Sequence, residues 1–182
     1  SMLHYEKNFY KDAFVSLFCT NIEANYATVI GLSCLALPAV IYFCLYASDL
    51  EDGRCRALKL FGAAQLLMMG IPLAGRIMNG MSYASNRWTY SLVFTASVML
   101  TMSFSGLVKC TMKRRLAVSA LSLAYIGACW FLKDTFDGKY KSASLLLLLV
   151  TVVLFLLCGW IGGDGQDLAG RQSGFPLNGW GI

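Results

Sequence analysis

Apolar residues gather in five long runs that short polar segments separate. The runs cover residues 26–47, 57–78, 88–108, 116–132 and 142–161. A helix needs about 20 mainly apolar residues to cross the ~30 Å of hydrocarbon in a bilayer, and each run approaches that length. The pattern therefore predicts an all-α protein, a polytopic transmembrane helical bundle of about five spans over residues 26–161.

The second run is less regular than the others. Gln65 lies inside it, and Pro72 interrupts its far end. Proline lacks a backbone N–H, but neighbouring groups in a membrane bundle can satisfy the carbonyl that it leaves unpaired. We therefore expect a single kinked helix over residues 57–78.

Different patterns flank the five runs. In residues 1–25, aromatic and leucine side chains recur at helical spacing among charged residues, which predicts a short amphipathic helix at the membrane surface. Thr20 and Glu23 then form a T-x-x-E capping box, which we expect to start the first span. Residues 162–182 are rich in glycine and lack an apolar period, so they predict a flexible tail.

The small share of charged residues supports a membrane protein, and the positions of the basic residues predict its orientation. The chain is 57% hydrophobic and 14% charged, against about 25% charged in ordinary soluble domains. Basic residues concentrate in the connections "SDLEDGRCRALK" and "KCTMKRR", which the positive-inside rule places in the cytoplasm. The N-terminus and the 79–88 loop then lie outside. Membrane loops explain the net charge of +5, so no nucleic acid partner is implied.

Cysteine and histidine usage predicts neither a disulfide framework nor a metal site. Four of the seven cysteines fall in predicted spans, where cysteine behaves as a small apolar residue. Cys55 and Cys110 fall on the predicted cytoplasmic side, where thiols stay reduced, and Cys19 has no obvious partner. His4 is the single histidine, and there is no C-x-x-C pair. We expect no metal and no cofactor.

The polar loop "NGMSYASNRW", residues 79–88, has two interpretations. In the first it is a turn, because Asn79-Gly80 is a turn dipeptide and Ser85 or Asn86 can cap the next helix. In the second it binds an anion, because a helix N-terminus next to an arginine attracts phosphate through its amides and its dipole. Asn79, Tyr83, Ser85, Asn86 and Arg87 are then the candidate residues for donor-phosphate or lipid binding.

A family resemblance favours the second interpretation. The segments "YATVIGLSCLALPAVIYFCLY" and "GIPLAGRIMNGMSYASNRWTYSLVF" resemble the YfhO family of bacterial multi-spanning membrane proteins over roughly residues 26–107. The loop is its most specific part, with Met81 in place of the more usual phenylalanine. The resemblance implies a GT-C-like glycosyltransferase in the bacterial cytoplasmic membrane. Such an enzyme transfers a sugar from a polyprenyl-phosphate donor to an envelope polymer such as lipoteichoic acid at the outer face.

The match to that family is partial, so an alternative stays open. Family members are several times longer and carry acidic residues in an outer loop that has no counterpart before Tyr26, so no catalytic residue is assigned. We expect this chain to be the central membrane segment of such an enzyme. The alternative is a small non-catalytic membrane protein that scaffolds partners or binds lipid headgroups. A transporter is disfavoured, because Gln65 is essentially the only polar interruption of the spans.

Overall fold

The protein is predominantly helical in the part of the chain that the structure describes. The computed structural model describes residues 5, 7–19, 32–47, 53–82, 86–132 and 141–172, and within these ranges it contains no strand. The elements are α1 (Lys7–Ser16), α2 (Ala36–Tyr46), α3 (Gly53–Met69), α4 (Pro72–Met78), the 3-10 helix η2 (Arg87–Thr89), α5 (Tyr90–Val108), α6 (Met112–Phe131) and α7 (Lys141–Gln172). The all-α prediction is confirmed.

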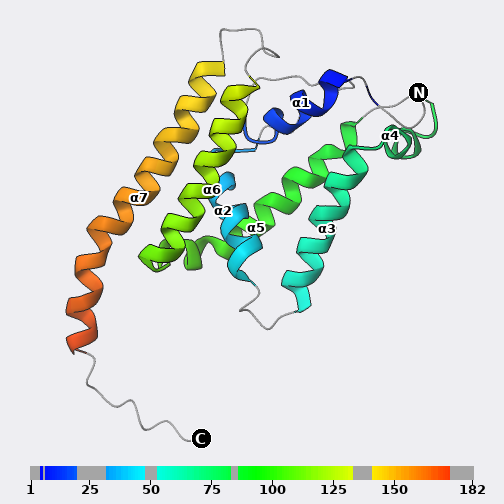
Figure 1. Cartoon of the computed structure of the whole chain (residues 1–182). Helices are drawn as coiled ribbons and strands as arrows, with labels where there is room; N and C mark the ends of the chain where they lie inside the picture. Colours follow the sequence, from blue (N-terminus) through cyan, green and yellow to red (C-terminus); the bar gives the residue numbers. More distant parts are fainter. Residues whose placement is uncertain are drawn as a thin grey trace, which may run out of the picture.

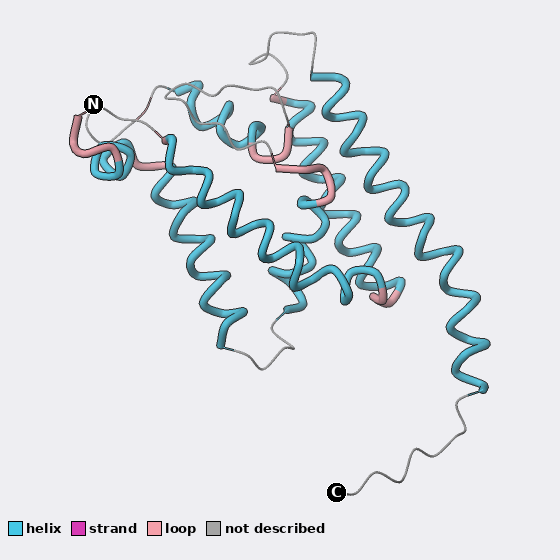
Figure 2. The backbone as a smooth tube through the Cα atoms, turned by 180° about the vertical axis from the view of Figure 1, so that it is seen from behind, coloured by secondary structure: helices cyan, strands magenta, loops and turns pink. Residues whose placement is uncertain are grey.

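The helices follow one another across the molecule in an order that differs from the chain order. α2 packs against both α5 and α6, while α7 contacts α6 and α3 contacts α5. Figure 1 therefore shows α7, α6, α2, α5 and α3 in succession, with α1 lying across one end of the bundle. The view from behind in Figure 2 shows the same arrangement of helices.

Small residues let α5 approach its neighbours closely. A β-carbon built on Gly106 would lie 2.9 Å from the Tyr42 hydroxyl oxygen, so this glycine makes room for a ring of α2. On the α3 side, a β-carbon on Gly62 would lie 3.1 Å from Cε of Met99. Close approach through small residues is the usual packing mode of helices in membranes, where water does not drive apolar side chains together.

The α1 helix buries side chains against the bundle, instead of lying only at a surface as the sequence predicted. Phe9 is fully buried, and Val15 is 2% exposed. The Tyr10 hydroxyl donates to the Gly70 carbonyl at 3.2 Å, and the Tyr125 hydroxyl of α6 donates to the Phe14 carbonyl at 2.8 Å. These contacts fasten α1 to the end of α3 and to α6.

The first predicted span is only partly helical where it is described. α2 begins at Ala36, and residues 32–35 before it are not helical. Eleven helical residues extend about 16 Å, which is roughly half of the hydrocarbon thickness. Residues 20–31, including the predicted capping box of Thr20 and Glu23, lie outside the described residues.

The second predicted span is broken rather than kinked. α3 ends at Met69 and α4 starts at Pro72, and the two helices are bent by 103° at the break. Ile71 takes an extended conformation, with φ −114° and ψ 114°, because the ring of a following proline disfavours the helical conformation. The sequence located the break correctly but underestimated the bend.

The remaining helices agree more closely with the sequence. Together, η2 and α5 form a helix over Arg87–Val108 that is long and apolar enough to cross a membrane, and α3 and α4 qualify only when taken as one bent span. α6 starts at Met112, four residues before the predicted span at 116. α7 continues to Gln172, so residues 162–172 of the predicted flexible tail are helical. No proline interrupts the chain there before Pro176.

Large apolar side chains also cover the outside of the bundle. Leu67 on α3, Phe94 on α5 and Phe131 on α6 are 71%, 71% and 88% exposed. Exposed leucine and valine side chains follow α7 from Leu146 to Leu157. Apolar surface this extensive on a monomer marks contact with a membrane or a protein partner.

Candidate functional site

Three of the five candidate binding residues in the 79–88 loop lie in the described part of the chain. Asn79 follows α4, Asn86 precedes η2, and Arg87 is the first residue of η2. Tyr83 and Ser85 lie outside the described residues.

Asn79 helps to build the turn that ends α4. Its side-chain amide donates to the Ser82 hydroxyl at 3.1 Å, and that hydroxyl donates to the Asn79 carbonyl at 2.8 Å. Gly80 and Met81 follow with φ of 63° and 61°, so the chain reverses through the left-handed region. The turn predicted for Asn79-Gly80 is confirmed, although Asn79 itself keeps a φ of −107°.

Asn86 points into the protein core. It is fully buried, and its Oδ1 accepts a hydrogen bond of 3.2 Å from the Tyr5 hydroxyl. Its backbone carbonyl accepts from both the N–H and the hydroxyl of Thr89, at 2.9 and 2.7 Å. The side chain makes no capping bond to the following helix, so of the two predicted caps Asn86 is excluded, and Ser85 lies outside the described residues. Because Asn86 bonds across to Tyr5, it links the chain before α1 to the start of α5.

Arg87 and Trp88 have opposite environments. Arg87 is exposed at the start of the membrane-length helix, whereas Trp88 is 7% exposed and packs in the main apolar cluster. The indole Nε1 has no hydrogen-bond partner within the described ranges. Of the predicted loop residues that are described, Arg87 is thus the cation that is open to solvent, while Asn86 is turned away from it.

A second candidate region is an apolar cavity of about 220 Å³ between α2, α3 and α5. Leu66, Leu92 and Met99 are among the side chains that line it, and among the described residues Lys59 is the one charged side chain in its lining. The Lys59 ammonium donates to the Cys44 carbonyl at 2.9 Å, in the last turn of α2, and lies 5.8 Å from the centre of the Phe43 ring. The cavity therefore combines apolar walls with a cation.

Arg115 is a buried cation that connects three helices. It lies on α6 and is 4% exposed, and its guanidinium donates to the Phe155 carbonyl of α7 and to the Val108 carbonyl of α5, the latter at 3.0 Å. The guanidinium also lies 4.6 Å from the centre of the Phe155 ring. Val108 ends α5, so a positive charge there also complements the negative end of the helix dipole.

The described side chains contain one carboxyl group, that of Asp12 on α1. Its Oδ1 is buried and has no hydrogen-bond partner in the described part. Burial raises the pKa of this carboxyl, and the nearby Lys11 lowers it in part. Among the described residues there is no cluster of histidine, cysteine or acidic side chains able to hold a metal ion.

No family model, no curated protein and no solved structure matches the chain.

Proposed function

We propose that the chain is the central membrane segment of a YfhO-like glycosyltransferase. In this proposal it binds a polyprenyl-phosphate sugar donor at the outer face of a bacterial cytoplasmic membrane. The sugar is then transferred to a cell-envelope polymer such as lipoteichoic acid. The observation that carries the proposal is an exposed arginine, Arg87, at the N-terminus of the helix that is long enough to cross the membrane.

The chemistry of the donor explains why this position is suitable. When the sugar leaves, negative charge builds on the lipid phosphate, and a fixed cation stabilises that charge. Arginine offers a planar set of donors that matches two phosphate oxygens, which a lysine ammonium cannot reproduce. The reaction also needs a base for the acceptor hydroxyl, and we assign no residue of this chain to that role.

The proposed multi-pass topology is supported by the positions of the two basic connections. Arg114 at the start of α6 lies 4.9 Å from the ring centre of Tyr46 at the end of α2. The end of α2 and the start of α6 therefore meet at one end of the bundle, opposite α1 and α4 (Figure 1). The positive-inside rule assigns the basic end to the cytoplasm, which puts Arg87 outside.

Donor binding by the purified protein in lipid nanodiscs tests the proposal. Arg87→Ala should weaken binding of an undecaprenyl-phosphate sugar by about tenfold or more, since a hydrogen bond to a charged group contributes about 1.5–3 kcal/mol. Arg87→Lys should recover only part of the loss. Arg56→Ala, which removes an exposed arginine at the basic end, is the matched control. Equal affinities for Arg87→Ala and Arg56→Ala would exclude Arg87 from the donor site.

The apolar cavity favours a second function, in which the chain binds lipid without catalysis. A cavity with apolar walls and Lys59 suits an acyl or isoprenoid chain attached to an anionic headgroup. Under this alternative, Leu66→Trp should fill the cavity and remove lipid that co-purifies with the parent protein, while Arg87→Ala should leave that lipid in place. Transfer of sugar by the parent chain alone would rule out a purely non-catalytic role.

A further inference from the structure

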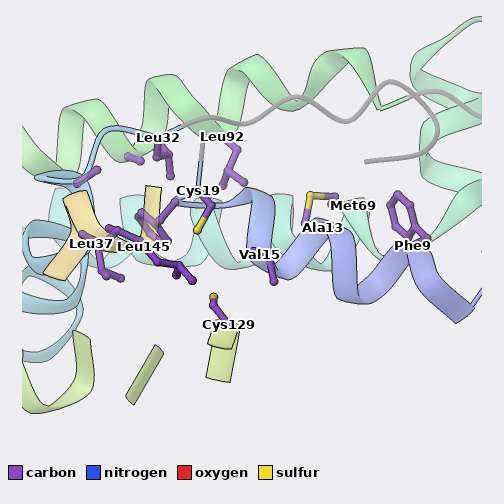
Figure 3. Close-up of a cluster of buried hydrophobic side chains, with 14 of the residues drawn as sticks. Phe9, Ala13, Val15, Cys19, Leu32, Leu37, Met69, Leu92, Cys129 and Leu145 are labelled. Carbon is purple, nitrogen blue, oxygen red and sulfur yellow. The ribbon is translucent and has the colours of Figure 1, made fainter. Parts of the chain in front are cut away.

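Two cysteines that are far apart in the sequence meet in the interior. Cys19 follows α1, and Cys129 lies in the last turn of α6; they are 2% and 0% exposed. Both belong to the main buried cluster. Figure 3 shows their sulfur atoms pointing toward one another across the interior of that cluster. This pairing could not be predicted from the sequence, because no local pattern links positions that are 110 residues apart.

The backbone around the pair is held in place from both sides. The Tyr125 hydroxyl, one helical turn before Cys129, donates to the carbonyls of Phe14 and Val15 at 2.8 and 3.3 Å. The Cys19 N–H in turn donates to the Val15 carbonyl at 3.1 Å. One hydroxyl of α6 thus anchors the end of α1, and the same contacts position the thiol of Cys19 beside that of Cys129.

The other cysteine near this pair is less well placed. Cys34 is half-buried and packs against the edge of the same cluster. Cys19 and Cys129 are both buried members of that cluster. Cys44 and Cys158 are exposed, so they would meet a dissolved reagent before either member of the buried pair.

We propose that Cys19 and Cys129 are a redox pair, which oxidation converts into a disulfide between the segment after α1 and α6. The oxidant is a low-molecular-weight disulfide such as oxidised glutathione. One protein thiol loses its proton and attacks a glutathione sulfur, which forms a mixed disulfide and releases one glutathione thiolate. The second protein thiolate then attacks the protein sulfur of that mixed disulfide and releases the other glutathione. Two protein thiols are oxidised by two electrons, one glutathione disulfide is reduced, and the two protons end on the glutathione thiols.

Burial and location determine when this reaction occurs. Because both thiols are buried, attack on a dissolved disulfide requires α1 to separate transiently from α6, so the reaction is slower than at an exposed cysteine. The pair lies at the end of the bundle opposite the basic connections (Figure 1). Under the proposed orientation that end faces the oxidising side of the membrane, where disulfides persist. The disulfide would hold α1 in place, and with it the contact of Tyr5 with Asn86.

Peptide mapping of the wild-type chain tests the proposal in detergent, where orientation has no influence. The protein is incubated with oxidised glutathione, its remaining thiols are alkylated, and it is digested with trypsin and a glutamate-specific protease. Residues 12–23 and 116–133 are then released as peptides that contain one cysteine each, Cys19 and Cys129 respectively. We expect most of the Cys129 peptide to be joined to the Cys19 peptide, while the peptide of residues 24–51, which contains both Cys34 and exposed Cys44, carries glutathione at Cys44.

Two controls keep the result decisive. In Cys19→Ser the linked peptide should disappear and the Cys129 peptide should be recovered alkylated or carrying glutathione. Reduction of the oxidised wild type should restore both peptides in alkylated form. The proposal is overturned if Cys129 stays fully alkylated while Cys44 reacts, or if Cys129 joins the peptide that contains Cys34. If Cys19→Ser fails to fold, the wild-type map alone still separates these outcomes.

Discussion

Alanine at position 159 is a direct test of Arg115 as the connection between α5, α6 and α7. A β-carbon built on Gly159 would overlap Cδ and Nε of Arg115 and would lie 2.7 Å from its Cζ. Real β-carbons essentially never come that close to another heavy atom, so the guanidinium or α7 must move. Moving the guanidinium breaks its hydrogen bonds to the Phe155 and Val108 carbonyls.

The expected cost follows from the contacts that are lost. A hydrogen bond to a charged group contributes about 1.5–3 kcal/mol, and forcing extra atoms into a packed site costs about 1–3 kcal/mol. Partial relaxation keeps these effects from adding in full, so we expect Gly159→Ala to lower the free energy of unfolding by about 2–4 kcal/mol. Denaturant unfolding in detergent micelles, followed by tryptophan fluorescence, measures this change.

A matched glycine and a double mutant isolate the cause. Gly127 lies on α6, and a β-carbon there would have nothing within 4 Å, so Gly127→Ala should be neutral or stabilise the helix by up to about 1 kcal/mol. In an Arg115→Leu background, Gly159→Ala should cost much less than in the wild type, because the clashing guanidinium is absent. The reasoning fails if Gly159→Ala matches Gly127→Ala, or if its cost is unchanged when Arg115 is replaced.

Two further predictions concern α1 and the packing of α5. Burial raises the pKa of the Asp12 carboxyl in the folded state. The protonated carboxyl therefore favours the folded state, and this stabilisation is fully present below the ordinary pKa of 3.8 and is lost as the pH rises through the pKa of the folded state. Asp12→Asn should therefore unfold at a higher temperature than the parent at pH 7, and the difference should vanish near pH 3; an equal difference at both pH values would contradict this. Gly106→Ala should cost about 1–3 kcal/mol because its β-carbon meets the Tyr42 ring, whereas Gly62→Ala should cost less than ~1 kcal/mol because it meets the flexible end of Met99. Thermal melts of the two variants side by side measure this, and equal costs would show that the Tyr42 ring yields as easily as a methionine.

The sequence predicted the helices better than their contacts. Apolar length located α5 and α6 because a long apolar run favours a helix whatever surrounds it. It merged α3 with α4, because apolarity continues across Ile71 while the backbone direction changes there. It also placed the end of α7 too early, since glycine weakens a helix without ending it.

The candidate site was predictable only in part, for a related reason. A polar loop between two apolar runs shows where a turn lies, and Asn79 and Gly80 behave accordingly. The direction of the Asn86 side chain depends on Tyr5, 81 residues earlier in the chain, and no local pattern reports such a partner. The meeting of Cys19 with Cys129 has the same origin. Contacts between distant segments arise from the way the helices assemble.

The sharp break after α3 has a consequence for the surrounding lipid. The 17 helical residues of α3 extend about 25 Å, which is less than the ~30 Å of an average hydrocarbon core, and the chain then turns away by 103° into α4. In the proposed membrane setting, this side of the bundle is shorter than the hydrocarbon core, and the basic residues at the start of α3 shorten its apolar part further, while the Arg87–Val108 helix on the other side of α3 is long enough to cross unaided. The bilayer would therefore thin locally beside α3 and keep its normal thickness beside α5. The lipid around the protein would therefore differ between its two sides, with shorter acyl chains on the side where the cavity lined by Lys59 lies.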